Sequence, residues 1–533
     1  MSNLNCQIIL TKCLAIFNEL KGVWNNMAER EQWGSRAGFI LAAIGSAVGL
    51  GNIWRFPYVA YENGGGAFLI PYLFALLTAG IPILIMEFSL GQRFRGSSPL
   101  TYARLNKKAE GMGWWQVAIA FVISTYYSVI IAWALSYTMF SFNLSWGDDP
   151  DSFFFNSFLH ATASANDMGS IVPGILIPLI LVWLVTLGVL FKGVKRGIEL
   201  ANRIIIPALV IMFLCIVIRA LTLEGAMTGL DAFFKPDWEG LREPAVWVAA
   251  YGHIFFSLSV AFAIMITYAS YLPKKADINN NAFIAGFSNS GFEILAGIGV
   301  FSVLGFMAVQ NGVGVNEVAT GGIGLAFVVF PQIISTFPGF NEFFGVLFFG
   351  CLVLAGLTSL ISIVETYVAG IQDKFNVSRT KAVIFGGGLS AIISLIYTTQ
   401  NGIRVLDTVD YFINNFGIAV SGLISVIVVA WILRKLPELK DHANSVSDFQ
   451  IGGWWTFCLT IVTPLVLGVM LIQNLVTNLT TNYEDYPTSF LIMFGWTVAI
   501  LAIVVGFVIT AIKWKTDKNK LTIEHIRKEG NDD

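Results

Sequence analysis

Long apolar stretches alternate with short polar segments along almost the whole chain. A helix of about 20 apolar residues crosses the hydrocarbon core of a bilayer. The pattern predicts an all-α membrane protein with twelve transmembrane helices, at residues 39–61, 66–92, 115–143, 172–190, 199–221, 246–271, 283–310, 342–373, 382–397, 404–433, 453–477 and 487–514. The apolar region 312–341 is broken by glycine and proline, and it is expected to form a short external helix pair. A thirteenth span there is the alternative.

The composition also indicates a membrane protein. The chain is 56% hydrophobic and 12% charged, which is typical of a polytopic membrane protein, so the net charge of -2 gives no indication of a nucleic-acid partner. Lys and Arg follow the even-numbered stretches, whereas the other loops are acidic or nearly neutral. The positive-inside bias therefore predicts a multi-pass protein of the cell membrane with both termini in the cytoplasm, including segments 1–35 and 516–533.

The first apolar stretch has an unusual polar interior. Gly45, Gly49, Gly51 and Asn52 lie near its middle, and Arg55 follows them. A helix broken within the membrane is tolerated only where it lines a cavity or is buried in protein, and the freed carbonyls and amides can then face ions. This interior predicts a transport site, with a kinked structural helix as the alternative. In the sixth stretch, residues 257–263 are compatible with a continuous helix by pattern alone.

Several sequence blocks carry a resemblance to one family. They read GNIWRFP at 51–57, WGSR at 33–36, EFSLGQ at 87–92, FFSLS at 255–259, TYASY at 267–271 and AGLTS at 355–359. With them, the chain resembles the sodium:neurotransmitter symporter family from about Arg30 to at least Asp410. The resemblance implies an inverted five-helix repeat, residues 36–225 against 240–433, with broken first and sixth helices and two further helices in 450–515. Ala261 and Ala263 stand where a bacterial member has glycine, and their methyl groups are expected to narrow the pocket.

The resemblance also implies two sodium sites. Sodium is a hard cation that prefers oxygen ligands. The first site would be formed by the substrate carboxylate with Ala47, Asn52, Ser257 and Asn289. The second would be formed by the carbonyls of Gly45, Val48 and Ala355 and the hydroxyls of Thr358 and Ser359. The residues themselves leave helix-internal hydrogen bonding as an alternative for the two hydroxyls.

An amino acid is the substrate that the resemblance implies. Its carboxylate would meet the amides of Leu50 and Gly51 and the hydroxyl of Tyr127, and its amino group would meet nearby carbonyls. Its side chain would lie among apolar residues, which predicts a neutral, hydrophobic amino acid. The expected substrate-binding residues are Ala47, Leu50, Gly51, Ile123, Tyr127, Phe256, Ser257, Ser259, Phe262, Ser359 and Ile363.

Two charged pairs are expected to act as gates. Arg55 and Asp410, bridged by water or His253, would close the outer side, and Arg30 with Asp373 would close the inner side. Gly197 and Pro207 in the fifth stretch resemble a family motif at which unwinding hydrates the second sodium site. A proline kink without a gating role is the alternative.

The carboxylates of Glu87 and Glu293 lie within apolar stretches, where ionisable residues are functional by default. Glu87 resembles a residue that supports the unwound sixth helix through backbone amides. Glu293 lies one turn after Asn289, on the same helix face. Animal relatives have serine there and recruit chloride, so no chloride requirement is expected. A protonated glutamate that serves packing is the alternative.

Together these features predict a sodium-coupled symporter for neutral amino acids that works by alternating access. A membrane sensor or channel-like protein that binds the amino acid without net transport is the alternative. An enzyme is not expected, because the four histidines form no metal-spaced cluster and no nucleophile–base pair is evident.

Overall fold

A computed structural model describes residues 31–515, and the secondary structure of this part is helical apart from two isolated β-bridges. Within residues 31–515, ten helices are long and apolar enough to cross a membrane, and a bent pair, Arg36–Ala47 with Leu50–Glu62, brings the number to eleven. The ten run Gly66–Phe94, Lys107–Phe140, Pro173–Phe191, Val194–Leu221, Asn279–Asn311, Asn341–Phe375, Arg379–Thr398, Gly402–Ile432, Gly453–Asp485 and Thr488–Ala511. Every apolar stretch predicted from the sequence, except the sixth, coincides with one of these helices or with the bent pair.

The first stretch is a broken helix. Helix α2 (Arg36–Ala47) begins at Ser35, whose hydroxyl accepts a hydrogen bond from the amide of Gly38, as N-cap side chains do. It ends before Val48 and Gly49, both of which have extended backbone. Helices α3 (Leu50–Trp54) and α4 (Phe56–Glu62) then continue at 57° to α2. The glycines thus mark a break, as the sequence predicted.

The sixth stretch is also broken, into α13 (Pro244–Ser257) and α14 (Ile264–Ala269). Three residues between or at the ends of these helices, Ser259, Ala261 and Ala263, have φ angles of 54°, 71° and 75°. Such values cost an L-residue about 1–2 kcal/mol. The continuous helix that the local pattern allows is therefore wrong, because contacts from distant helices hold the break open.

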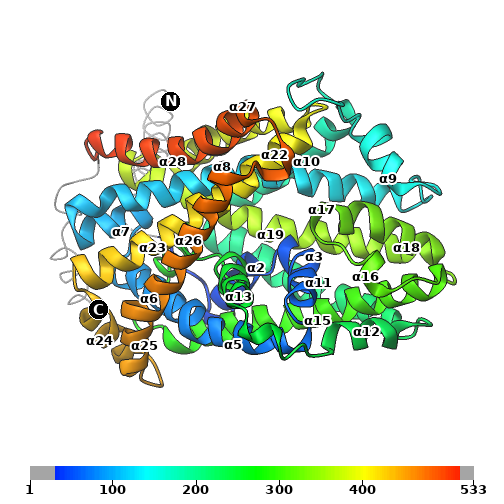
Figure 1. The fold of residues 1–533 in the computed structure, drawn as a ribbon. Coiled ribbons are helices and arrows are strands. Elements are labelled where there is room, and N and C mark those ends of the chain that lie inside the picture. Colours follow the sequence, from blue (N-terminus) through cyan, green and yellow to red (C-terminus); the bar gives the residue numbers. More distant parts are fainter. Residues whose placement is uncertain (1–30, 516–533) are drawn as a thin grey trace, which may run out of the picture.

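Long helices surround the two breaks. Two of the long helices, α8 (Glu110–Phe140) and α19 (Asn341–Phe375), pack against each other, and α19 also packs on α2. In Figure 1, α2, α3 and α13 lie near the middle of the molecule. The short helices α9 (Pro150–Ser152), α12 (Ala226–Phe234), α16 (Val315–Val318) and α18 (Phe330–Thr336) gather at the right-hand end. At the opposite end lie α7 (Ser98–Leu105) and α24 (Leu436–Val446).

The remaining helices complete the framework around this centre. They include α5 (Leu69–Ala75), α6 (Ile81–Phe94), α10 (Pro173–Phe191), α11 (Leu200–Leu221), α15 (Asn279–Asn311), α22 (Gly402–Phe412), α23 (Ala419–Ile427), α26 (Thr463–Thr480) and α28 (Thr497–Val508). The region 312–341 contains α16 and the apolar helical run Gly322–Thr336, which is too short to be a membrane span. The expected short helix pair is present, and the thirteenth span is not.

Candidate ion and substrate site

A cavity of about 460 Å³ lies between the two helix breaks, with α8 and α19 forming further walls. All of the residues that the sequence analysis assigned to substrate binding line it. The break in the first stretch supplies Ala47, Leu50 and Gly51; the sixth supplies Phe256, Ser257, Ser259 and Phe262; α8 supplies Ile123 and Tyr127; α19 supplies Ser359 and Ile363. Two distant chain segments, each broken, therefore face one common space.

One side of the cavity offers hydrogen-bond donors. The backbone amide of Leu50 donates to the hydroxyl of Tyr127 at 3.3 Å. Gly51, next along the chain, also lines the cavity, and no other group lies within 4 Å of where its side chain would begin. These amides open the half-helix formed by α3 and α4, and the start of a helix carries unpaired N–H groups that favour an anion. A carboxylate would fit this side.

Another part of the cavity wall is apolar. Ile123 and Ile363, from α8 and α19, face the cavity with the aromatic side chains of Phe256 and Phe262. The expectation that the methyl groups of Ala261 and Ala263 narrow the pocket is wrong, because neither residue lines the cavity and both are buried away from it. The pocket is instead bounded on this side by the aromatic rings.

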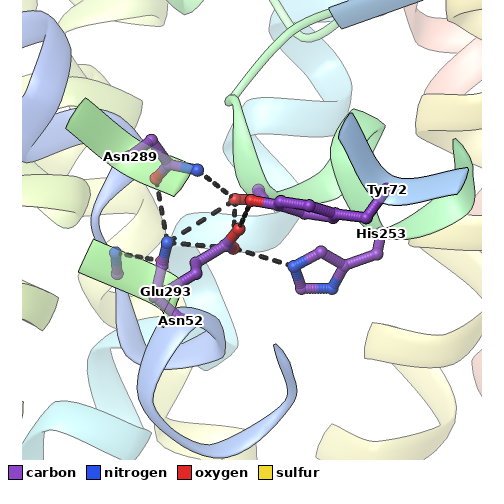
Figure 2. Close-up of polar contacts among 7 residues, drawn as sticks. Asn52, Tyr72, His253, Asn289 and Glu293 are labelled. Carbon is purple, nitrogen blue, oxygen red and sulfur yellow. Dashed lines mark hydrogen bonds and ion pairs between the residues drawn. The ribbon is translucent and has the colours of Figure 1, made fainter. Parts of the chain in front are cut away.

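Beside the cavity lies a buried polar cluster centred on Glu293 of α15 (Figure 2). Oε1 of Glu293 lies 2.5 Å from the hydroxyl of Ser257, 3.1 Å from Nδ2 of Asn52 and 2.8 Å from Nε2 of His253. Oε2 accepts a hydrogen bond from the hydroxyl of Tyr72. The Glu293 side chain has no solvent exposure. Buried carboxylates are costly unless they are hydrogen-bonded or paired, and here both oxygens have partners.

The same cluster brings together three side chains expected at the first sodium site. Nδ2 of Asn52 donates to Oδ1 of Asn289 at 2.8 Å, and Nδ2 of Asn289 donates to the hydroxyl of Ser257 at 2.5 Å. The amide oxygen of Asn52 accepts from the backbone of Gly49 at 2.8 Å, which ties it to the first break. Neutral amide and hydroxyl oxygens next to one carboxylate form a donor set that suits a hard monovalent cation.

His253 does not occupy the place expected for it. The sequence analysis named water or His253 as the bridge between Arg55 and Asp410, but Nε2 of His253 contacts Glu293, and its ring packs on Phe56 with a centroid separation of 5.3 Å. His253 and Ser257 are four residues apart on α13 and therefore share one helix face. That face is turned toward α15 rather than toward the outer pair.

Two of the oxygens expected at the second sodium site, from Gly45 and Ser359, meet where α2 contacts α19. The hydroxyl of Ser359 lies 3.4 Å from the carbonyl of Gly45 and 3.2 Å from that of Ala355, and the hydroxyl of Thr358 lies 2.9 Å from the carbonyl of Ala355. Val48 is buried, at the end of α2. The helix-internal hydrogen bonds left open as an alternative are thus present, and so is the convergence of carbonyl and hydroxyl oxygens from two helices.

The outer gate pair is not in contact. Within residues 31–515, Arg55 and Asp410 form no ion pair; the guanidinium of Arg55 lies over the ring of Phe256, 4.6 Å from its centroid. Asp410 lines the cavity and accepts a hydrogen bond from Nδ2 of Asn414 at 2.8 Å. At the other side, Arg30 lies outside the described residues, and Oδ2 of Asp373 accepts from the amide of Ser97 at 2.8 Å.

The expected contact of Glu87 with the sixth stretch is present, whereas the segment from Gly197 to Pro207 is helical throughout. Oε1 of Glu87 accepts a hydrogen bond from the amide of Ala261 at 2.8 Å, inside the break of the sixth stretch. Gly197 lies in a wide helical turn, η5 (Val194–Glu199), that precedes α11, and Pro207 lies inside α11.

One buried ion pair was not predicted from the sequence. Glu365 of α19, which has no solvent exposure, pairs with Nη2 of Arg379 at 2.6 Å and accepts from the hydroxyl of Tyr271 at 2.6 Å. The signal was present, because a carboxylate within an apolar stretch marks a functional position. Arg379 also lies 3.4 Å from Oε1 of Glu31, the first described residue.

Comparison with known proteins agrees with this geometry. Residues 30–150 and 147–517 match the model of the sodium:neurotransmitter symporter family. An uncharacterised sodium-dependent transporter of Methanocaldococcus jannaschii is 42% identical over 91% of the chain and 98% of its own length. A sodium-dependent dopamine transporter of Caenorhabditis elegans is 31% identical, over 86% of the chain and 83% of its own length. A human sodium- and chloride-dependent neutral and basic amino acid transporter is 30% identical, over 89% and 84% respectively.

Proposed function

Because the chain belongs to the sodium:neurotransmitter symporter family, it is a sodium-dependent membrane transporter and not an enzyme, and we propose that it couples sodium entry to uptake of neutral, hydrophobic amino acids. In this proposal the protein lies in the cell membrane with both termini in the cytoplasm. Its twelve helices include the pair α13 and α14 as one broken span, and two five-helix repeats related by inversion alternate access to the cavity.

The proposal rests on one observation: the same cavity is lined by hydrogen-bond donors and by apolar side chains. Amides of Leu50 and Gly51 and the hydroxyl of Tyr127 stand on one side, and Ile123 and Ile363 stand on an apolar wall. A zwitterion with an apolar side chain satisfies both, whereas a charged side chain at the apolar wall would lose its hydration without a partner.

Coupling follows from the position of the polar cluster. Asn52 and Ser257 belong to the two broken stretches that line the cavity, and Asn289 and Glu293 belong to α15. A sodium ion held by Asn52, Ser257, Asn289, the Ala47 carbonyl and the substrate carboxylate would bind well only with the amino acid. A second ion would be held by the carbonyls of Gly45, Val48 and Ala355 and the hydroxyls of Thr358 and Ser359.

Glu293 is the reason to propose independence of chloride. Two sodium ions and a zwitterion bring net positive charge into a low-dielectric region, where a nearby negative charge is favourable. The carboxylate of Glu293 lies 2.5 Å from the hydroxyl of Ser257 and supplies that charge as part of the chain. No mobile anion is then required.

The gates complete the cycle in this proposal. Arg55 and Asp410 would approach each other when the outer side closes over the substrate, and Arg30 with Asp373 would separate when the inner side opens. Unwinding between Gly197 and Pro207 would hydrate the second sodium site. Arg55 already lies against Phe256, a cavity residue.

Uptake of a labelled amino acid into liposomes containing the purified protein tests the proposal. We expect accumulation driven by an inward sodium gradient, abolished when potassium replaces sodium or when gramicidin collapses the gradient. Sodium-dependent binding in detergent without accumulation in the liposomes would support the alternative of a membrane sensor or channel-like protein.

A further inference from the structure

Asn202 of α11 has a buried acceptor with no donor in the described part of the chain. Its side chain is fully buried, and its Nδ2 donates to the carbonyl of Ile198 at 2.9 Å, one turn earlier. That bond fixes the orientation of the amide, and Oδ1 receives no hydrogen bond from any described group. An unpaired buried acceptor costs free energy and is uncommon in folded proteins, so this oxygen requires an explanation.

The unpaired oxygen points at Gly45 of α2. A Cβ atom placed on Gly45 would lie 2.3 Å from Oδ1 of Asn202, so the amide oxygen lies directly against the glycine. Gly45 is also the residue whose carbonyl lies 3.4 Å from the hydroxyl of Ser359 on α19. Two helices therefore bring side-chain oxygens to the same residue of α2, and only the one from α19 has partners.

Asn202 lies in the part of the chain that the sequence analysis expected to unwind. It lies between Gly197, in the wide turn η5, and Pro207, which cannot donate a backbone hydrogen bond within the helix. Its amide is held by Ile198, a residue of that wide turn. An amide oxygen is a neutral, hard ligand of the type that suits sodium, and here it is already stripped of water and of protein donors.

We propose that Oδ1 of Asn202 is a further sodium ligand, supplied by α11 to the second sodium site. The inference rests on the proposed function, because it requires a sodium ion between α2 and α19. The competing explanation is close helix packing, in which the oxygen contacts the Cα–H group of Gly45, a weak interaction. The two explanations predict different responses to sodium.

The test is thermal unfolding of the purified full-length protein in detergent at increasing sodium, with choline replacing sodium at constant ionic strength. A ligand that binds only the folded state raises its stability as its concentration rises. Without amino acid, the first site lacks the substrate carboxylate, so the response reports chiefly the second site. Asn202→Leu removes the oxygen and keeps a side chain that branches at Cγ, and Asn202→Asp keeps an oxygen and adds charge.

We expect Asn202→Leu to raise the half-saturating sodium concentration about tenfold, and Asn202→Asp to lower it by a few-fold, because ligand number and charge set cation affinity. A packing role would move both variants in the same direction or leave both at the wild-type value, and either result overturns the inference. If Asn202→Leu does not fold, Asn202→Asp alone decides: a half-saturating concentration at or above the wild-type value overturns it.

Asn279→Leu is the matched control. Asn279 is also a buried asparagine with an unpartnered Oδ1 among the described residues, but it begins α15 and its Nδ2 contacts Asn444 and Phe449. Its substitution should change stability without changing the sodium dependence. A wild-type protein that shows no sodium response would overturn the proposed function itself, whereas a normal wild-type response with an unaffected Asn202→Leu would overturn only this inference.

Discussion

The carboxylate of Glu87 and the backbone amide of Ala261 form a 2.8 Å hydrogen bond that joins α6 to the break in the sixth stretch. Both residues are almost completely buried. The carbonyl of Ala261 accepts from the hydroxyl of Ser421 at 2.9 Å, so one residue of the break is held at both of its backbone polar groups. Ala261 thereby keeps a φ angle of 71° that alanine would otherwise avoid.

Replacement of Glu87 should reveal how much this bond contributes. Glu87→Leu leaves the amide of Ala261 buried without an acceptor, and we expect it to lower the free energy of unfolding by about 1–3 kcal/mol and to abolish uptake. Glu87→Gln retains an acceptor oxygen and should keep most of the wild-type stability and most of the uptake. Thermal unfolding and liposome uptake measure the two effects. Equal losses in Leu and Gln variants would show that charge, not the hydrogen bond, matters.

Loss of an amide from the polar cluster should weaken sodium and substrate together. Asn52→Ala and Asn289→Ala each remove an oxygen and a donor that contacts Glu293 or Ser257. We expect the half-saturating concentrations of sodium and of amino acid to rise at least about tenfold in equilibrium binding. Asn474→Ala is the control, because Asn474 contacts Asn415 at 3.0 Å and lies outside the cluster. A change in amino-acid affinity at unchanged sodium affinity would contradict coupling.

A competition panel should define the substrate class. The wall formed by Ile123, Phe256, Phe262 and Ile363 carries no charge, and burying an unpaired charged side chain against it is costly. We expect alanine, valine and leucine to displace bound label at much lower concentrations than lysine or glutamate. Tight binding of lysine or glutamate with weak binding of the aliphatic amino acids would be inconsistent with the proposed pocket.

Uptake should not need chloride. Replacing chloride with gluconate is expected to leave wild-type uptake unchanged, because Glu293 carries the compensating charge. Glu293→Ser removes that charge and should produce a variant that chloride stimulates, with the donors Tyr72, His253 and Asn52 left to contact the anion. Glu87→Gln is the control, since Glu87 lies outside this cluster. Collapse of wild-type uptake in gluconate would refute the assignment.

The sequence predicted the first break better than the second, for a physical reason. Gly45, Gly49 and Gly51 make the backbone at the first break locally permissive, and composition alone reveals this. At the second break Ala261 and Ala263 have no such freedom, and bonds from Glu87 and Ser421, distant in the chain, impose the conformation. Tertiary contacts of that kind cannot be read from a local pattern.

The candidate site, too, could be predicted only in part from the sequence. The oxygens and apolar residues around the cavity were predicted through the resemblance to the family, residue by residue. His253 was placed at the wrong partner because the sequence does not tell which neighbour faces a given side of α13. The partners of Asn202 and of Glu365 depend on how α11, α19 and the segment after it pack, and no motif contains that information.

Phe256 and Ser257 are consecutive residues at the end of α13, yet they serve different neighbours. The ring of Phe256 lies under the guanidinium of Arg55, and the hydroxyl of Ser257 lies in the cluster with Glu293 and Asn289. Because both side chains belong to the same helix, a rotation or tilt of α13 that changes one contact also changes the other. A sodium ion bound at the cluster would therefore act on the contact between Arg55 and Phe256 through α13 alone.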